Sequence, residues 1–259
     1  MMTRTGAALA WVSYCGYLVA IVTIELVTTF LSTQVGMGAQ LALMTILLID
    51  ASVARRDERT LLVALLFAPL IRVASLALPF AAVPVIAWYA LICLPLGVAV
   101  IFAARILGLS RQDFGLRGGH VLAQIGIGLL GIPLGAMSYV LLRPASLIAD
   151  LHWQTILAPA LILLVSTGLL EELIFRGLLQ SAVETVLGRW GIVYSSAVFA
   201  ALQIGNRSPL AVAFAFLVGF VFAWCVRRTH SISGAAIAHG LMSVGAYLVL
   251  PHLIGSGSL

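Results

Sequence analysis

The chain alternates between long apolar runs and short polar breaks, and this pattern predicts a series of membrane-spanning helices. Most of the runs are about 20 residues long, which is the length that an α-helix needs to cross the hydrocarbon core of a bilayer. We therefore expect an all-α, polytopic membrane protein of about eight to nine transmembrane helices. The predicted spans lie near residues 7–31, 37–53, 61–80, 84–106, 120–142, 154–178, 191–204, 209–226 and 232–252.

The first and the seventh of these runs have unusual lengths. The run from Ala7 to about Phe30 exceeds the short apolar core of a cleavable signal peptide, so we expect it to be a retained span. The run 191–204 would cover only about 21 Å as a straight helix, against a hydrocarbon core of roughly 30 Å. Such a short segment is predicted to need protein neighbours or a watery cavity.

Composition supports the membrane class and excludes two others. Hydrophobic residues make up 62% of the 259 residues and charged residues 9%, against roughly 25% charged in an ordinary soluble domain. Nine spans leave roughly 80 residues for all loops and both termini, so no soluble domain fits. The formal net charge is +5, but the basic residues are scattered between apolar runs and form no patch for nucleic acid. The three cysteines lie in apolar runs and suggest no disulfide framework.

The arginines predict the orientation, because cytoplasmic loops are enriched in basic residues. All 14 basic residues are arginine, which fits a GC-rich bacterial genome, so we expect an integral protein of a bacterial cell membrane. If the N-terminus is cytoplasmic, eleven arginines fall on the cytoplasmic side, Arg143 and Arg207 fall outside, and Arg72 lies in a span. The odd number of spans then places the C-terminus outside. The eleven are Arg4, Arg55, Arg56, Arg59, Arg105, Arg111, Arg117, Arg176, Arg189, Arg227 and Arg228.

Ionisable side chains inside the spans are the candidates for function, because burying them in lipid is costly unless they are paired or hydrated. Glu25 and Arg72 lie in the first and third spans, and we expect them to form a structural ion pair. In the fifth span, Gly131 and Gly135, with Gly128 one turn earlier, are predicted to form a small-residue face for close helix contact.

The sixth span places two adjacent glutamates about 9 to 10 Å inside its cytoplasmic end. Glu172 and Arg176 stand at i,i+4 and are predicted to pair, whereas Glu171 points about 100° away and has no arginine at that spacing. A carboxylate without a cationic partner in a low-dielectric cavity is suited to accept a proton from water. We therefore predict that Glu171 is a general base.

His239 in the last span is predicted to share this site. It lies about 10 Å from the cytoplasmic start of its span and therefore level with the glutamates. Ser243 follows on the same face at i,i+4, and small residues around His239 allow another helix to approach. Gln203 lies near the far end of the seventh span, at a depth of about 18 Å, so it joins the others only through tilt or a funnel open to the cytoplasm.

At these residues the chain resembles the CPBP family of CAAX-processing and bacteriocin-processing intramembrane proteases, also called the Abi family. The family motif E-E-x-x-x-R is matched completely by residues 171–176. The motifs F-x-x-x-H and H-x-x-x-N are matched in part, by Phe199-x-x-x-Gln203 and His239-x-x-x-Ser243. Residues 107–117 also look like the segment that leads into the family core. The resemblance covers roughly residues 105–250, so we expect N-terminal helices outside the core at 1–106 and a CPBP-like core at 107–259.

The resemblance implies an intramembrane endopeptidase that uses a glutamate-activated water. Glu171 would be the base, Glu172 and Arg176 a supporting pair, and His239 a donor to the oxyanion. Gln203 and Ser243 would stand in for the family's histidine and asparagine. Glutamine can hold a water but cannot exchange a proton, and serine reaches less far than asparagine.

The expected partners are the lipid bilayer and a membrane-associated peptide or protein substrate, and no cofactor is expected. Zinc favours three ligands from His, Glu, Asp or Cys, and only Glu171 and His239 qualify well, so zinc is disfavoured. Two alternatives remain at this stage. One is a non-catalytic relative that acts as a scaffold or self-immunity protein, and the other is a small transporter, although the chain shows no inverted repeat.

Overall fold

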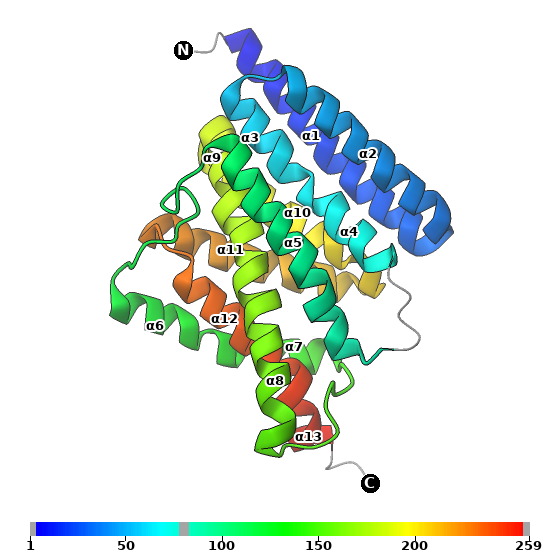
Figure 1. The fold of residues 1–259 in the computed structure, drawn as a ribbon, viewed down its shortest axis with the longest axis vertical. Coiled ribbons are helices and arrows are strands. Elements are labelled where there is room, and N and C mark those ends of the chain that lie inside the picture. The colour runs from blue at the N-terminus through cyan, green and yellow to red at the C-terminus, as the bar shows by residue number, and fades with distance from the viewer. Residues whose placement is uncertain (1–3, 78–82, 256–259) are drawn as a thin grey trace. The chain divides into compact units, whose positions relative to one another are not determined.

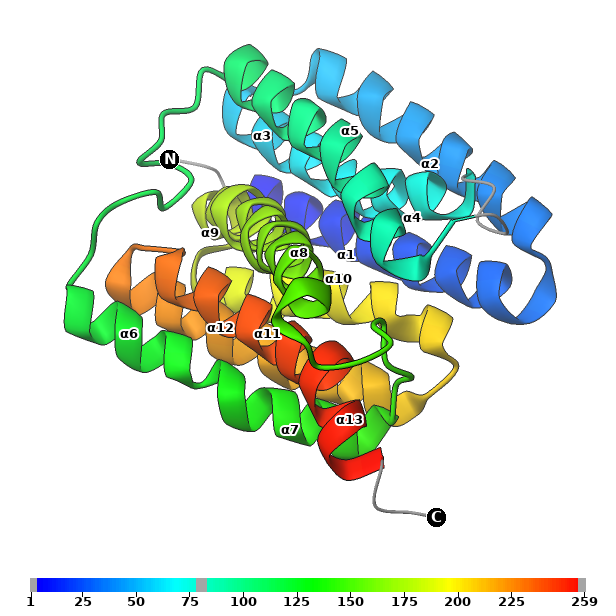
Figure 2. The same cartoon turned by 60° about the horizontal axis from the view of Figure 1, so that its bottom comes forward.

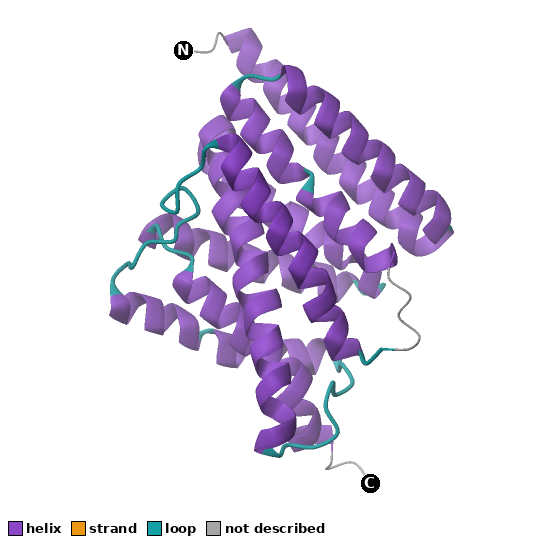
Figure 3. Ribbon diagram, in the orientation of Figure 1, coloured by secondary structure: helices purple, strands orange, loops and turns teal. Residues whose placement is uncertain are grey.

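Most of the residues that the computed structural model describes are helical, and the described residues are 4–77 and 83–255, with side chains from residue 11 onward. Figure 3 shows helices and loops, and no strand occurs within these two ranges. Eight helical stretches in the described residues are long and apolar enough to cross a membrane. The predicted class, an all-α membrane protein of eight to nine spans, is confirmed. The end of the predicted third span, at residue 80, lies outside the described residues.

The difference between eight and nine spans arises in the middle of the chain. The stretch Trp153–Asn206 is one helical succession of 54 residues, and it contains both the predicted span 154–178 and the short predicted span 191–204. Gly188 interrupts it with a φ of +60°, a backbone conformation that glycine adopts without steric cost. The sixth and seventh predicted spans are therefore two arms joined at a tight turn.

Residues 1–76 and 179–220 form one compact unit. Its α-helices are α1 (Arg4–Leu26), α2 (Thr33–Val53), α3 (Arg56–Leu65), α4 (Phe67–Ala77), α9 (Ser181–Leu187), α10 (Gly191–Ala201) and the first part of α11 (Pro209–Thr229). It also contains the π-helical turn η1 (Val27–Leu31) and the 3₁₀ turn η6 (Leu202–Asn206). Helices α1 and α2 run side by side (Figure 1).

The short helix α10 is surrounded by protein, as its length predicted. Nine of its eleven residues are buried, and it contacts α1, α9 and η6. A helix too short to span the hydrocarbon core is thus enclosed by neighbouring helices of its own unit.

Residues 77–178 and 221–259 form the second compact unit. Its α-helices are α5 (Val85–Leu107), α6 (Val121–Leu129), α7 (Gly131–Leu142), α8 (Trp153–Leu163), the end of α11, α12 (Ser233–Val244) and α13 (Leu250–Gly255). The π-helical segments η3 (Leu164–Leu170) and η4 (Leu173–Gln180) follow α8, and the π-helical turn η7 (Gly245–Val249) follows α12. In Figure 2, α6 and α7 lie along α12.

Glycines of α6 and α7 bring these helices close to α12. A Cβ atom on Gly131 would lie 2.2 Å from the carbonyl oxygen of Ala238, and one on Gly135 would lie 2.9 Å from that of Met242. Gly128 similarly faces Ile237. The predicted small-residue face is confirmed, and its partner is the helix that carries His239. The predicted boundary between residues 106 and 107 concerns the family core and stays a prediction.

Candidate active site

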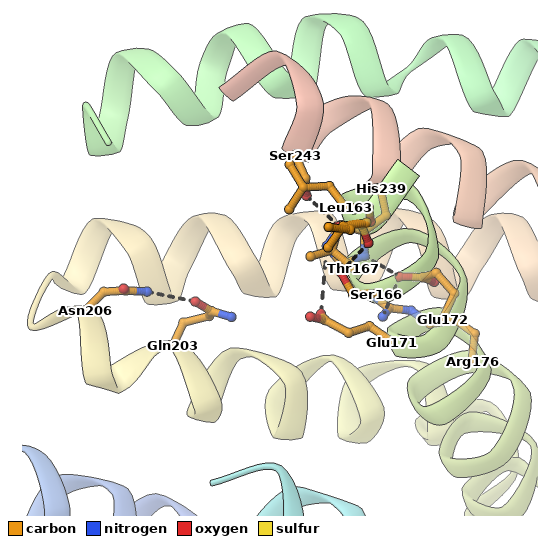
Figure 4. A network of polar contacts seen from close by, with 11 residues as sticks. Leu163, Ser166, Thr167, Glu171, Glu172, Arg176, Gln203, Asn206, His239 and Ser243 are labelled. Atoms are coloured by element: carbon orange, nitrogen blue, oxygen red, sulfur yellow. Dashed lines mark hydrogen bonds and ion pairs between the residues drawn. The ribbon is translucent and has the colours of Figure 1, made fainter. Parts of the chain in front are cut away.

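The two adjacent glutamates lie between two π-helical segments. Residues 171 and 172 follow η3 and precede η4, and the helix continues through all of them. π-Helical turns are rare and often occur at functional sites, because the wider turn redirects side chains relative to an α-helix. Figure 4 shows Glu171 and Glu172 directed toward His239 from this part of the helix.

Glu172 is fully buried and holds two partners through one oxygen. Arg176 Nη1 donates to Glu172 Oε1 at 3.0 Å, and His239 Nδ1 lies 2.8 Å from the same oxygen. The predicted i,i+4 ion pair is confirmed. The contact with His239 was not predicted, and it makes Glu172 the link between η4 and α12.

Arg176 is also buried, and aromatic rings surround it. Its guanidinium carbon lies 5.9 Å from the ring centroid of Phe175 and 5.8 Å from that of Phe222. The Phe222 ring also lies 5.9 Å from the His239 ring, at a tilt of 48°. Phe222, from the end of α11, therefore covers both basic groups and supplies apolar surface and a cation–π contact where water is excluded.

His239 presents its second ring nitrogen to Glu171. The Nε2 atom lies 3.9 Å from Glu171 Oε2, while Nδ1 is occupied by Glu172. A carboxylate at Nδ1 fixes the orientation of an imidazole and keeps a proton on that nitrogen. The structure thus brings Glu171 and His239 together, as their matching depths predicted.

The two glutamates differ sharply in accessibility. The Glu171 side chain is 33% exposed, whereas that of Glu172 is 0% exposed. One carboxylate is thus enclosed by its cationic partners, and the other belongs to a partly exposed side chain. This is the difference between the two carboxylates that the i,i+4 spacing predicted.

Two glycines allow η3 and α12 to approach closely enough for these contacts. A Cβ atom on Gly168 would lie 2.7 Å from the carbonyl oxygen of Ala236, and one on Gly240 would lie 2.6 Å from the Leu164 side chain. Any larger side chain at either position would push the glutamate-bearing helix away from His239.

Ser243 lies one turn beyond His239 and is buried, but its hydroxyl is engaged. It lies 2.9 Å from the Thr167 hydroxyl, which in turn lies 2.8 Å from the carbonyl oxygen of Leu163. Ser166 beside it donates to the Ile162 carbonyl oxygen at 2.6 Å. Ser243 therefore joins α12 to η3 in this structure, and its predicted role toward a substrate stays a prediction.

Thr167 and Phe222 were missed by the sequence reasoning. Thr167 stands four residues before Glu171 and is a polar residue in an apolar span, which was a usable signal. Phe222 is one of several phenylalanines in α11, and nothing in the local sequence distinguishes it from the others.

Gln203 belongs to the other compact unit, in η6. It is half-buried, and its Oε1 accepts a hydrogen bond from Asn206 Nδ2 at 2.7 Å. Its predicted place beside Glu171 and His239 stays a prediction. Glu25 and Arg72 form the predicted ion pair, and Arg72 Nε donates to Glu25 Oε1 at 2.8 Å.

The side chains gathered at this site do not form a metal-binding set. Among the described residues, no three His, Cys, Asp or Glu side chains are grouped so as to hold a metal ion. Glu172, the third candidate ligand beside Glu171 and His239, is already paired with Arg176. Whether the reaction needs a metal stays a prediction.

The comparisons with known proteins agree with the motifs. Residues 153–245, roughly a third of the chain, match the family described as Type II CAAX prenyl endopeptidase Rce1-like. The match contains residues 171–176, Gln203, His239 and Ser243, and it confirms the resemblance to the CPBP family. No curated protein and no solved structure matched the chain.

Proposed function

We propose that this integral membrane protein is an intramembrane endopeptidase that hydrolyses a membrane-associated peptide or protein. The premise is that residues 153–245 match the Rce1-like CAAX prenyl endopeptidases. One observation carries the proposal. The accessible carboxylate of Glu171 faces the ring nitrogen of a histidine whose other nitrogen is held by a second, enclosed carboxylate.

The spacing between Glu171 and His239 fits one water molecule. Hydrogen bonds to oxygen are roughly 2.8 Å long, and an oxygen at that distance from both groups fits between atoms that are 3.9 Å apart. Glu171, as the more exposed of the two carboxylates, would receive the proton of this water.

The proposed mechanism requires a protonated His239 and an ionised Glu171. Glu171, Glu172 and Arg176 together carry one net negative charge, and one proton held by His239 brings the cluster to neutrality. A neutral cluster is the cheaper arrangement in a low-dielectric region. His239 then has an N–H at Nε2 that can donate to a developing oxyanion, while Nδ1–H donates to Glu172.

The reaction then proceeds with two proton transfers through Glu171. Glu171 removes a proton from the water, and the hydroxide adds to the scissile carbonyl carbon to give a tetrahedral oxyanion that accepts a hydrogen bond from His239. The carbonyl re-forms as the C–N bond breaks, and protonated Glu171 gives its proton to the leaving amine. Glu172, Arg176 and Phe222 hold His239 in place and contribute no atom to the reaction.

Glu171→Gln tests the proposal. Glutamine keeps the size of the side chain but cannot accept the proton, so turnover of a fluorogenic membrane peptide should fall by about 100-fold to 10,000-fold. The melting temperature should stay close to that of the wild type, because Glu172 still neutralises Arg176.

A matched control removes a carboxylate elsewhere. Asp57→Asn changes an exposed residue in the first turn of α3 and should leave turnover unchanged. Full turnover by Glu171→Gln would exclude Glu171 as the base and contradict the proposed mechanism.

A further inference from the structure

A fully buried glutamate in the first helix organises a polar network inside the first unit. Glu25 on α1 is 0% exposed, and its Oε1 accepts hydrogen bonds from Arg72 Nε on α4 at 2.8 Å and from Gln40 Nε2 on α2 at 3.0 Å. Three helices outside the family match at 153–245 therefore meet at one carboxylate.

Arg72 extends this network into the segment that the family match covers. Its Nη2 donates to the carbonyl oxygen of Leu202 at 2.7 Å. Leu202 begins η6 directly after α10, and Gln203 is the next residue. Gly205 leaves room for the guanidinium, because a Cβ atom there would lie 3.2 Å from Arg72 Nη1.

The other end of the same turn is tied to η1, the turn that follows the first helix. Arg207 has a φ of +54° and follows η6, and its Nη2 donates to the carbonyl oxygen of Thr29 in η1 at 3.0 Å. The five-residue turn that carries Gln203 is thus held at its start by Arg72 and just beyond its end by Arg207.

We propose that the Glu25–Arg72 pair is a positioning device that fixes the conformation of η6 and so the placement of the Gln203 side chain. Its consequence for turnover rests on the function proposed above, whereas its consequence for the conformation of the turn does not. Arg72 and Glu25 are positioning residues that act through the backbone of Leu202.

Stability alone gives no reason for this arrangement. Replacing a buried ion pair with apolar residues of similar size is often neutral or stabilising. An apolar pair could not donate to the Leu202 carbonyl, however, and that hydrogen bond is the contact that a positioning role requires. The arrangement also requires an arginine rather than a lysine. One guanidinium donates both to the Glu25 carboxylate and to the Leu202 carbonyl oxygen.

The first experiment measures the turn directly and needs no substrate. Gln203→Cys is introduced into a chain whose three native cysteines are replaced, and the rate of reaction with a water-soluble maleimide is measured with and without Glu25→Gln plus Arg72→Met. The paired change removes the donor to Leu202 and leaves no buried charge. We expect labelling to become at least about five-fold faster, because local opening of a released turn exposes the thiol.

Tyr17→Phe is the matched control for this experiment. It removes the hydrogen bond that Tyr17 on α1 donates to Asp50 on α2. This contact joins α1 to α2 but does not reach η6. Its labelling rate should match the reference. Equal labelling rates in all three chains would overturn the positioning role.

The second experiment is a double-mutant cycle on turnover. The paired change should lower kcat by about ten-fold with KM within two-fold of the wild type, and it should have less than a two-fold effect in a Gln203→Ala background. Equal effects in both backgrounds would show that the pair acts on the fold as a whole and would overturn its link to Gln203. Loss of turnover in Glu171→Gln is scored separately, so failure of the proposed function is distinguishable.

Discussion

At the scale of single residues, Glu172 oxygen Oε1 serves both Arg176 and His239, which makes Glu172 a structural group. Removing its charge with Glu172→Gln leaves a buried arginine without a carboxylate. We expect a loss of about 3–5 kcal/mol in the free energy of unfolding, seen as a lower melting temperature in detergent and lower expression. Glu171→Gln is the comparison, and equal losses of stability in the two variants would contradict the division of roles.

Gln203 gives the second prediction at this scale. Gln203→His restores the residue type of the family's second motif and adds a group that can exchange protons near neutral pH. If Gln203 serves the same water as Glu171, turnover should rise by roughly 10-fold to 100-fold, within the range of a positioned acid–base group. The measurement is cleavage of a fluorogenic membrane peptide.

The double variant Gln203→His plus Glu171→Gln is its control. Turnover that persists in the double variant would show that Glu171 is not the base. An unchanged rate in Gln203→His would show that residue 203 does not reach the reacting water.

The sequence predicted these residue contacts from spacing along one helix and from matching depths on different helices. The Glu172–Arg176 pair follows from i,i+4 spacing, and the depth match placed His239 level with Glu171. Which glutamate His239 would contact more closely depends on how η3, η4 and α12 pack, and local spacing does not contain that information. Thr167 was a usable signal as a polar residue in an apolar span, but its partner Ser243 is 76 residues away, so local spacing could not predict their contact.

At the scale of helices, close approach to α12 depends on glycine. Gly131→Ala would place a Cβ atom 2.2 Å from the Ala238 carbonyl oxygen, so α7 and α12 must move apart. Overpacking of this kind costs about 1–3 kcal/mol, and His239 follows Ala238, so turnover should fall together with the melting temperature.

Gly126→Ala in α6 is the matched control for this helix contact. A Cβ atom at residue 126 meets nothing within 4 Å, and alanine favours the helix by about 1 kcal/mol over glycine. Its melting temperature should be unchanged or slightly higher. A similar destabilisation in both glycine variants would show that helix packing does not explain the effect.

Hydrophobic patterning predicted the helices and the glycine contacts but not the π-helical segments. An apolar run looks the same whether its hydrogen bonds join residues four or five positions apart, so η3 and η4 left no mark in the pattern. Similarly, the pattern predicted two separate spans at 154–178 and 191–204, because it does not record that helix continues on both sides of Gly188.

At the scale of the whole molecule, the arginine distribution gives a topology that can be tested. Residues 55–59 and 227–230 are predicted to lie in cytoplasmic loops, with the C-terminus outside. In the structure, α3 begins at Arg56 and α11 ends at Thr229, so most of these residues belong to helix ends rather than to loops. Single cysteines at Asp57→Cys and His230→Cys, in a chain without native cysteines, should react with an impermeant maleimide only from the cytoplasmic side.

Ala145→Cys, in the exposed loop between α7 and α8, should react from the opposite side. Labelling of residue 57 or residue 230 from outside would overturn the predicted orientation and the cytoplasmic opening of the site.

The short proton path proposed for the site also bears on how the protein responds to an energised membrane. Moving one elementary charge through a potential of 100 mV involves about 2.3 kcal/mol, so a rate follows the voltage only where a step moves charge along the field across the bilayer. In the proposed mechanism, the proton that Glu171 exchanges travels only between adjacent atoms. Turnover in proteoliposomes should therefore be the same with and without a potassium-diffusion potential, which would let the protein work in resting and energised cells alike.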